Sequence, residues 1–187
     1  MRKIIVMNMV SVDGYFALSD GNIDWHNVDD EFNKFSIEVL SNVDTILFGR
    51  VTYDLFESYW PKALSDPKTS EDDRKIAQAI NDIHKMVFSA SGKELTWNNS
   101  AVFRTIDEDQ IHDLKEQDGK DIIIYGSGTV VQQLTDMGLI DEYHLMVNPI
   151  ILGMGKALFD EVNTLKLELM SDRTFNNGNV LLSYRPA

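Results

Sequence analysis

Apolar side chains recur along this chain in short runs that alternate with amphipathic segments. Near-continuous apolar runs predict buried strands at residues 4–10, 45–48, 85–88, 121–125 and 142–147. A weaker run indicates a further strand at residues 101–103. Apolar residues at helical spacing predict helices over residues 29–40, 51–60, 76–83, 107–117 and 130–137. Strands that alternate with helices favour a mostly parallel sheet with helices on its faces.

The last part of the chain follows a different pattern. Residues 165–169 alternate between apolar and polar side chains, which predicts a half-exposed antiparallel strand. The sequence Asn176-Asn177-Gly178-Asn179 is a hairpin signal, and residues 180–184 form the returning strand. The polar stretch 61–73 is interpreted as a surface loop. We therefore expect one α/β domain over residues 1–187, a three-layer α/β/α sandwich whose mixed, mainly parallel sheet ends in a C-terminal antiparallel hairpin.

Composition removes several classes of function. The 187 residues include 30 acidic and 17 basic side chains and no cysteine, and the formal net charge is −13. This charge argues against a surface for nucleic acid or for an anionic membrane. The lack of cysteine excludes a disulfide framework, a thiolate nucleophile and an iron–sulfur cluster. No apolar run approaches the ~20 residues of a membrane span. We expect a cytoplasmic protein whose partner is a small molecule.

The strongest local signal for a ligand is a glycine-containing turn between a strand and a helix. Gly126, Ser127, Gly128 and Thr129 follow the predicted strand at 121–125 directly. Glycines let the backbone approach a ligand, and the start of a helix offers free N–H groups to a phosphate. The motif falls short of the full dinucleotide fingerprint, because Val131 stands where a third glycine or an alanine is needed. A tight turn without a ligand is the alternative.

Two other strand ends carry small or hydroxyl-bearing residues. Gly49, Arg50 and Thr52 follow one predicted strand, and Ser89 and Ser91 follow the next. Arginine and threonine suit a phosphate, although a solvated arginine and a plain serine turn explain each motif taken alone. Open parallel sheets bind ligands at the carboxyl ends of their strands. One extended anion, such as a nicotinamide dinucleotide with an extra ribose phosphate, would reach all three motifs.

Four segments in register resemble the dihydrofolate reductase-like superfamily. They are Met9-Val10-Ser11-Val12-Asp13-Gly14, Ile46-Leu47-Phe48-Gly49-Arg50-Val51-Thr52-Tyr53, Ile124-Tyr125-Gly126-Ser127-Gly128, and Ile140-Asp141-Glu142-Tyr143 followed by residues 149–159. The resemblance covers nearly the whole chain. It is nearest to the reductase domain at the C-terminus of the bacterial bifunctional riboflavin biosynthesis deaminase-reductase. It implies an NADPH-dependent oxidoreductase, often a homodimer, that transfers a hydride to a small heterocyclic or carbonyl substrate.

The resemblance also implies roles for residues of this sequence. Gly49, Arg50 and Thr52 would hold the adenosine side of NADPH and its phosphates. Ser89 and Ser91 would lie near the ribose phosphate. The four residues from Gly126 to Thr129 would cradle the pyrophosphate. The loop that borders the nicotinamide and the substrate would contain Asp13 and Gly14.

One departure from the resemblance concerns the proton donor. Dihydrofolate reductases use an acid on the first helix, and counting back from Gly49 places that position near Asn33, although the alignment could slip toward Asp30 or Glu31. Reduction of the riboflavin-pathway type, on 5-amino-6-(5-phosphoribosylamino)uracil or a related substrate, is therefore favoured over pterin reduction. The cysteine and histidine elements of a zinc deaminase are absent from the sequence. A cofactor-binding module without catalysis and a partner-binding protein stay open.

Proton transfer and substrate contact need further side chains. Asp13, Glu57 and Tyr125 are the candidate catalytic residues, while His26 is more typical of a surface loop. An aromatic group could wall a flat substrate, although aromatics at helical spacing often belong to the core. This group consists of Trp25, Phe56 and Trp60. The histidines show no ligand spacing, so no metal site is expected.

Overall fold

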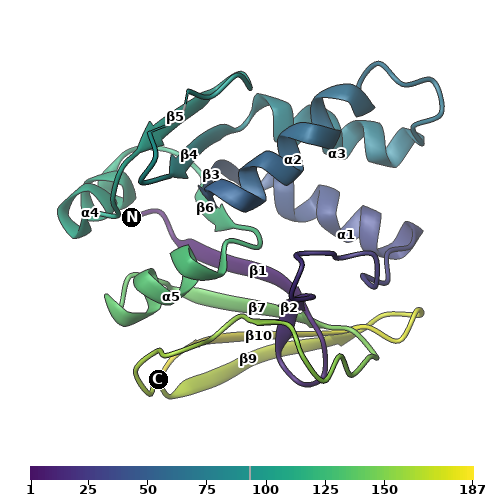
Figure 1. Cartoon of the computed structure of the whole chain (residues 1–187). Helices are drawn as coiled ribbons and strands as arrows, with labels where there is room; N and C mark the ends of the chain where they lie inside the picture. Colours follow the sequence, from purple (N-terminus) through teal and green to yellow (C-terminus); the bar gives the residue numbers. More distant parts are fainter. Residues whose placement is uncertain (93) are drawn as a thin grey trace.

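The computed structural model describes residues 1–92 and 94–187 and contains one large sheet (Figure 1). Its strands lie in the order β5-β4-β3-β6-β1-β7-β10-β9. The first six of these are parallel, β10 is antiparallel to β7, and β9 is antiparallel to β10. The strands are β1 Ile4–Val10, β3 Val43–Gly49, β4 His84–Phe88, β5 Ser100–Phe103, β6 Asp121–Ile124, β7 Glu142–Val147, β9 Leu167–Thr174 and β10 Val180–Pro186.

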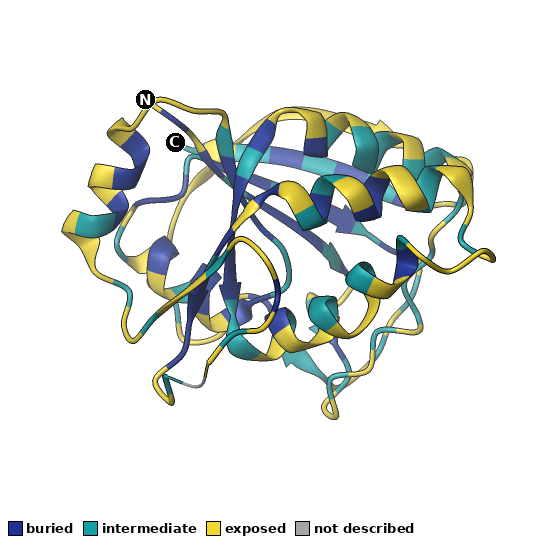
Figure 2. Ribbon diagram, turned by 90° about the horizontal axis from the view of Figure 1, so that it is seen from above, coloured by how far each residue is buried: buried dark blue, intermediate teal, exposed yellow. Residues whose placement is uncertain are grey.

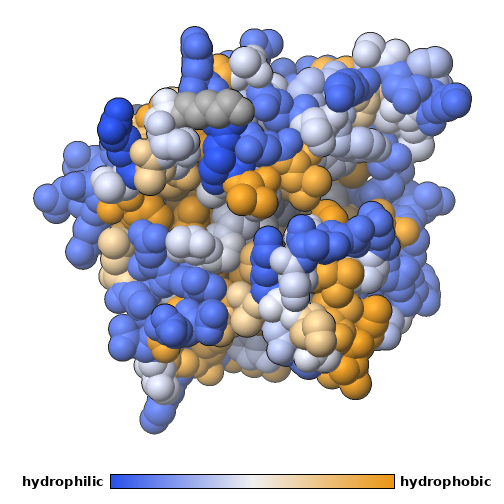
Figure 3. Space-filling model, viewed as in Figure 1, coloured by the Kyte–Doolittle hydropathy of each residue, from blue (hydrophilic) through white to orange (hydrophobic). Residues whose placement is uncertain are grey.

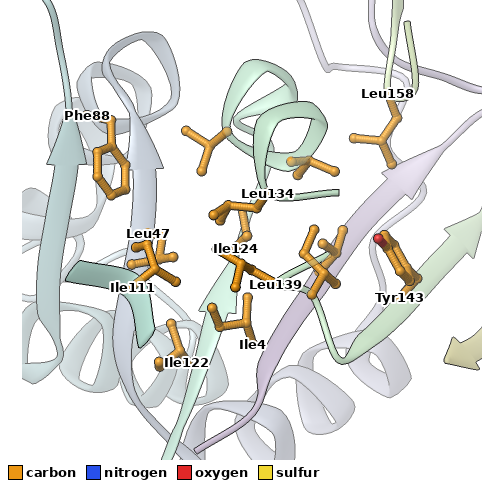
Figure 4. Packing of buried hydrophobic residues seen from close by; sticks show 14 of the residues in the cluster. Ile4, Leu47, Phe88, Ile111, Ile122, Ile124, Leu134, Leu139, Tyr143 and Leu158 are labelled. Atoms are coloured by element: carbon orange, nitrogen blue, oxygen red, sulfur yellow. The ribbon is translucent and has the colours of Figure 1, made fainter. Parts of the chain in front are cut away.

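Helices cover both faces of the sheet. One apolar cluster joins the sheet to α1 (Asp30–Ser41), α2 (Arg50–Ala63) and α3 (Glu71–Asp82). The opposite cluster joins it to α4 (Glu108–Glu116) and α5 (Gly128–Asp136), as Figure 4 shows. Side chains of β6 alternate between them: Ile122 and Ile124 face α4 and α5, whereas Ile123 faces the other helices. The predicted sandwich, mainly parallel with a C-terminal hairpin, is confirmed.

Burial follows this layering. The inner strands are dark blue in Figure 2, and each helix is exposed on its outer side. Within the described residues, no helix is both long enough and apolar enough to cross a membrane.

The predicted loop at residues 61–73 is wrong at both ends. Helix α2 includes Pro61 and continues to Ala63, and α3 begins at Glu71. A proline removes one helical hydrogen bond, which is tolerable here because the helix ends within the same turn. Ser70 caps α3, since its Oγ accepts from the Asp73 N–H at 3.1 Å.

Strand β9 differs from its prediction in burial. Alternation at residues 165–169 indicated one buried face, yet all eight residues of β9 are exposed. The strand lies at the edge of the sheet, beyond the reach of the helices (Figure 1). The sequence also gave no sign of a small second sheet that pairs β2 (Tyr15–Ala17) with β8 (Lys156–Ala157), because two or three residues carry no readable period.

Candidate functional site

A cleft of about 1720 Å³ follows the edge of the sheet where the parallel strands end. It begins beside the residues after β5, passes the ends of β4, β3 and β6, and reaches helices α1 and α3. In the space-filling view, apolar side chains lie beside the recess near the centre of the face shown (Figure 3). The topology therefore brings together three motifs that lie 37 or more residues apart in the sequence: Gly49, Arg50 and Thr52 after β3, Ser89 after β4, and the turn 126–129 after β6.

The turn after β6 has a backbone that few side chains allow. Gly126 and Ser127 both have φ of +52°. A Cβ on Gly126 would lie 2.8 Å from Thr52 Oγ1, and a Cβ on Gly128 would lie 2.8 Å from the ring of Phe16. Close approach therefore disfavours a side chain at both glycines, and the dihedral angle disfavours one at Gly126 as well. We call residues 126–129 the cradle.

Hydroxyl groups tie the cradle to the start of α2. The Ser127 N–H donates to Thr52 Oγ1 at 2.9 Å, and the Gly49 N–H donates to Ser127 Oγ at 3.0 Å. Asn8, which is buried on β1, adds Nδ2 as a donor to the Gly126 carbonyl oxygen at 3.0 Å. The side chains of Thr52 and Ser127 thus hold the two turns in register. Sequence reasoning missed Asn8, because its role depends on a hydrogen bond to Gly126, which is 118 residues away in the chain.

The two helices that begin directly after β3 and β6 differ from the others in how they start. The N-cap residues of α1, α3 and α4, which are Asp29, Ser70 and Asp107, each accept a backbone hydrogen bond with the side chain. The N-caps of α2 and α5 are Gly49 and Ser127, and neither caps its helix with a side chain. Two helix ends therefore direct backbone N–H groups and partial positive charge at the same cleft, an arrangement suited to phosphates.

Basic side chains at this end of the cleft come from two strand ends. Arg50 pairs with Asp54, with Nη2 2.8 Å from Oδ1, and lies over the ring of Tyr53. Arg104 follows β5, lines the cleft with Ser89 and lies against Gly92, where a Cβ would be 3.5 Å from Nη2. Sequence reasoning missed Arg104, although a basic residue after a predicted strand end was the signal that selected Arg50. Ser91 lies 3.0 Å from Ser89, between hydroxyl oxygens, and is not among the cleft-lining residues.

The three predicted catalytic residues do not meet at one place. Tyr125 lines the cleft and stacks on Phe56 with centroids 5.9 Å apart, and burial raises the pKa of its hydroxyl. Glu57 lines a separate small cavity and accepts hydrogen bonds from the hydroxyls of Tyr53 and Thr96 at 3.1 and 2.7 Å. Asp13 also lies outside the cleft lining.

Asp13 instead fixes a loop. Its carboxylate accepts from the N–H groups of Leu152 and Gly153 at 3.1 and 2.7 Å. A hydrogen bond from Ser11 and these backbone donors lower the pKa of Asp13 to about 2. A carboxyl group this acidic stays ionised near neutral pH, so the geometry suits an anchor for the loop better than a proton donor.

Two of the three predicted aromatic substrate residues line the cleft. Phe56 and Trp60 line the cleft, whereas Trp25 does not. The ring of Trp25 instead packs against the ring of His26, with centroids 4.5 Å apart. His26 lines the cleft, and burial lowers its pKa to about 4. It is therefore a neutral imidazole near neutral pH. Within the described residues, no group of three or more histidines and carboxylates could hold a metal ion.

Beyond the cradle, the cleft opens between α1, α3 and the second half of α2. We call this part the helical compartment. Its apolar walls come from Phe32 and Leu40 of α1, Phe56 and Trp60 of α2, and Ile76 and Ile80 of α3. Its polar groups include Asn33, whose Nδ2 donates to Asp73 Oδ1 at 3.1 Å. Asn33 therefore lines this compartment. It is the residue near which the resemblance to dihydrofolate reductases predicts an acid.

The mainly parallel sheet, covered by helices on both faces and ended by an antiparallel hairpin, has the α/β architecture of the dihydrofolate reductase-like fold. The sequence profile of the RibD C-terminal domain matches residues 2–181. The chain belongs to this family. The Bacillus subtilis (strain 168) protein YyaP is 33% identical over 185 residues, which are 98% of this chain and 94% of YyaP, and it is named an uncharacterized protein.

Solved structures agree with the fold. A protein of Shewanella sp. PV-4, provisionally assigned to riboflavin biosynthesis, superimposes with a TM-score of 0.74 at 23% identity over 100% of this chain and 99% of its own. A Thermotoga maritima diaminohydroxyphosphoribosylaminopyrimidine deaminase/5-amino-6-(5-phosphoribosylamino)uracil reductase gives a TM-score of 0.67 at 16% identity, over 100% of this chain and 57% of that longer one. The resemblance inferred from sequence is confirmed, and the family supports a reductase-like function.

Proposed function

We propose that this chain is an NADPH-dependent reductase that transfers a hydride to a C=O or C=N bond of a small heterocyclic substrate, in the manner of the reductase named for the Thermotoga maritima protein. The observation that carries the proposal is the pair of uncapped helix starts, Gly49 of α2 and Ser127 of α5, at one cleft. A dinucleotide has a pyrophosphate and further phosphate groups, and these groups need donors in such positions.

The residues present fit this cofactor. Thr52 and Phe16 pack directly against Gly126 and Gly128 and hold the cradle backbone at the cleft, where the N–H groups at the start of α5 would bind a phosphate. Arg50 and Arg104 would hold the extra ribose phosphate, with Ser89 between them as a hydroxyl donor. NADPH supplies the hydride when it is bound. The protein excludes water along the apolar walls and orients the substrate against the cofactor.

A cofactor-binding module without catalysis is the second candidate. Two observations favour it. Asp13 and Glu57 lie outside the cleft, and Asn33 is found about where the resemblance predicts a proton-donating acid. Binding of NADPH without turnover on any pyrimidine, pterin or carbonyl substrate would select this candidate over the reductase.

Titration of the protein with NADPH, followed by nicotinamide fluorescence, tests the cofactor. Saturable binding at micromolar NADPH is expected, and its absence would refute the proposal. Arg50→Ala and Arg104→Ala should each weaken NADPH by about tenfold, because each removes a charged hydrogen bond to phosphate, and should leave NADH nearly unchanged. Arg185→Ala is the matched control, since Arg185 is exposed and pairs with Glu168 on β9. Equal losses for NADPH and NADH would contradict the phosphate role.

A further inference from the structure

One segment of the cleft wall is held in place from outside the cleft. Residues 18–29 connect β2 to α1, and this bridging segment includes the cleft-lining residues Asp24, His26 and Val28. Asn27 lies between two of these residues in the sequence and does not line the cleft. Its side chain and backbone instead bond to residues that come 121 to 152 positions later in the chain. The position of this part of the wall therefore depends on what Asn27 contacts.

The turn between β9 and β10 binds Asn27 from two directions. Asn27 Nδ2 donates to the Asn177 carbonyl oxygen at 2.7 Å, and the Asn27 carbonyl oxygen accepts from Asn177 Nδ2 at 3.0 Å. The same carbonyl oxygen accepts from Asn179 Nδ2 at 2.8 Å. At the end of β7, Asn148 Oδ1 accepts from the Asn27 N–H at 2.8 Å. We call these four asparagines the clamp.

One buried polar group is left unpaired in the clamp. Asn179 is fully buried, and its Oδ1 has no hydrogen-bond partner among the described residues. Turning this amide over would not help, because its oxygen would then face the Asn27 carbonyl oxygen, and two acceptors cannot bond to each other. The donor of Asn179 therefore stays on Asn27, although an unpaired buried acceptor costs free energy. The clamp is maintained against this cost by the contacts that Asn177 adds.

Asn177 and Gly178 form the one Asn-Gly pair of this sequence. Asparagine is chemically labile, and a following glycine has no side chain to block attack by its own backbone nitrogen. That nitrogen forms a C–N bond to the side-chain carbonyl carbon of Asn177 and gives up its proton. The side-chain nitrogen leaves as ammonia, and a cyclic imide remains. Water then opens the imide at either carbonyl carbon, which gives aspartate or isoaspartate with no oxidant or reductant.

The folded turn holds both reacting groups away from this reaction. The Gly178 N–H donates to the Phe175 carbonyl oxygen at 3.0 Å, which fixes the attacking nitrogen. The Asn177 amide is held at both ends, because Nδ2 bonds to Asn27 and Oδ1 accepts from the Asn179 N–H at 3.0 Å. Attack on the side chain therefore requires the clamp to open. Gly178 is exposed, so the water that completes the reaction is available at the turn.

The product of this reaction cannot rebuild the clamp. A carboxylate at position 177 has no N–H group, so the hydrogen bond to the Asn27 carbonyl oxygen is lost and two acceptors face each other. Isoaspartate also adds one carbon to the main chain, which displaces the carbonyl oxygen that accepts from Asn27 Nδ2. Either product weakens the hold of the hairpin on the bridging segment.

We propose that Asn177 is a deamidation site that the clamp protects, and that its conversion to aspartate or isoaspartate releases the bridging segment from the β9–β10 hairpin. The change runs in one direction, because ammonia leaves. It loosens the wall of the cleft beside His26, and Asn27 is the positioning residue through which the hairpin acts on that wall. The inference does not depend on which cofactor or substrate the cleft binds.

Peptide mass spectrometry on protein incubated at mildly alkaline pH tests the protection. We expect Asn177 to deamidate at least about tenfold more slowly in the folded protein than in the urea-unfolded chain. Asn27→Ala should speed the folded-state reaction about fivefold, because it removes the hydrogen bond that holds the Asn177 backbone. Asn22→Ala is the matched control in the same segment, since the Asn22 side chain bonds to Asp24 and not to the hairpin. Equal rates in the folded and unfolded chain, or equal effects of the two variants, would overturn the protection.

Hydrogen exchange and NMR test the release of the bridging segment. Asn177→Asp mimics one product, and Asn98→Asp is the matched control, because it adds the same charge at an exposed asparagine outside the clamp. In Asn177→Asp, amide exchange in residues 24–29 should be about five- to tenfold faster. The pKa of His26 should rise from about 4 toward 6.5, because release reduces the burial of its ring.

Wild-type protein that has deamidated at Asn177 provides a second sample, which keeps the test decisive if the Asn177→Asp variant folds poorly. It should show the same faster exchange and the same rise in the pKa of His26. Unchanged exchange and an unchanged pKa of His26 in the deamidated protein would overturn the inference. Changes of equal size in Asn98→Asp would also overturn it, because they would follow from charge alone.

Discussion

Replacement of Gly126 by alanine tests whether close packing against Thr52 fixes the conformation of the cradle. The variant places a Cβ 2.8 Å from Thr52 Oγ1 and 2.9 Å from Thr52 Cγ2, at a residue with φ of +52°. Positive φ costs a non-glycine residue roughly 1–2 kcal/mol. Displacing Thr52 also weakens the hydrogen bond from the Ser127 N–H, worth about 1 kcal/mol. We expect a loss of about 2–3 kcal/mol in the free energy of unfolding.

Gly138→Ala is the matched control, because Gly138 has φ of +69° and no atom within 4 Å of its Cβ position. The dihedral cost and the entropy of the unfolded chain are shared by the two variants, so the difference isolates the contact with Thr52. Urea unfolding should show Gly126→Ala to be less stable than Gly138→Ala by about 1 kcal/mol, and NADPH affinity should fall only in Gly126→Ala. Equal stability and equal affinity in the two variants would refute the reasoning.

Three other predictions follow from single contacts. Burial lowers the pKa of His26 from 6.5 to about 4 in the folded state, so the unfolded state binds the proton more tightly. The free energy of unfolding therefore falls as the pH drops from about 6.5 to about 4. His26→Gln should lessen this fall by up to about 3 kcal/mol in acid unfolding curves. Glu57→Gln should lower the melting temperature by a few degrees, because its hydrogen bonds to Tyr53 and Thr96 become weaker. NADPH affinity should not change, and a large change would place Glu57 in the binding site. The homodimer stays a prediction, and the exposed edge strand β9, with Leu169 52% exposed, is the surface through which two copies would pair. Leu169→Lys should then convert a dimer to a monomer in sedimentation. A wild-type protein that is already monomeric would contradict the homodimer.

Strand and helix identity could be predicted from local pattern. The runs around Ile4 and Ile123 are continuous and apolar because parallel strands are buried on both faces, and that composition is visible in a single sequence. The cradle was equally readable, since a Gly-Ser-Gly turn between a strand and a helix is a local sequence signal, and Gly126 has the positive φ that glycine favours. Helix ends were less readable, as Pro61 shows, because the last turn of a helix is decided by packing as well as by propensity.

Sequence alone therefore determined the layers of this protein, the family resemblance, and the strand ends that line one end of the cleft. Tertiary structure decided which side chains face that cleft. Asp13 and Glu57 carry suitable chemistry but bond to the loop at Gly153 and to Thr96, while Asn33 gains its orientation from Asp73, 40 residues away. Hydrophobic period fixes the face of an element because it repeats over many residues, whereas the direction of one polar side chain depends on a single distant partner that no period records.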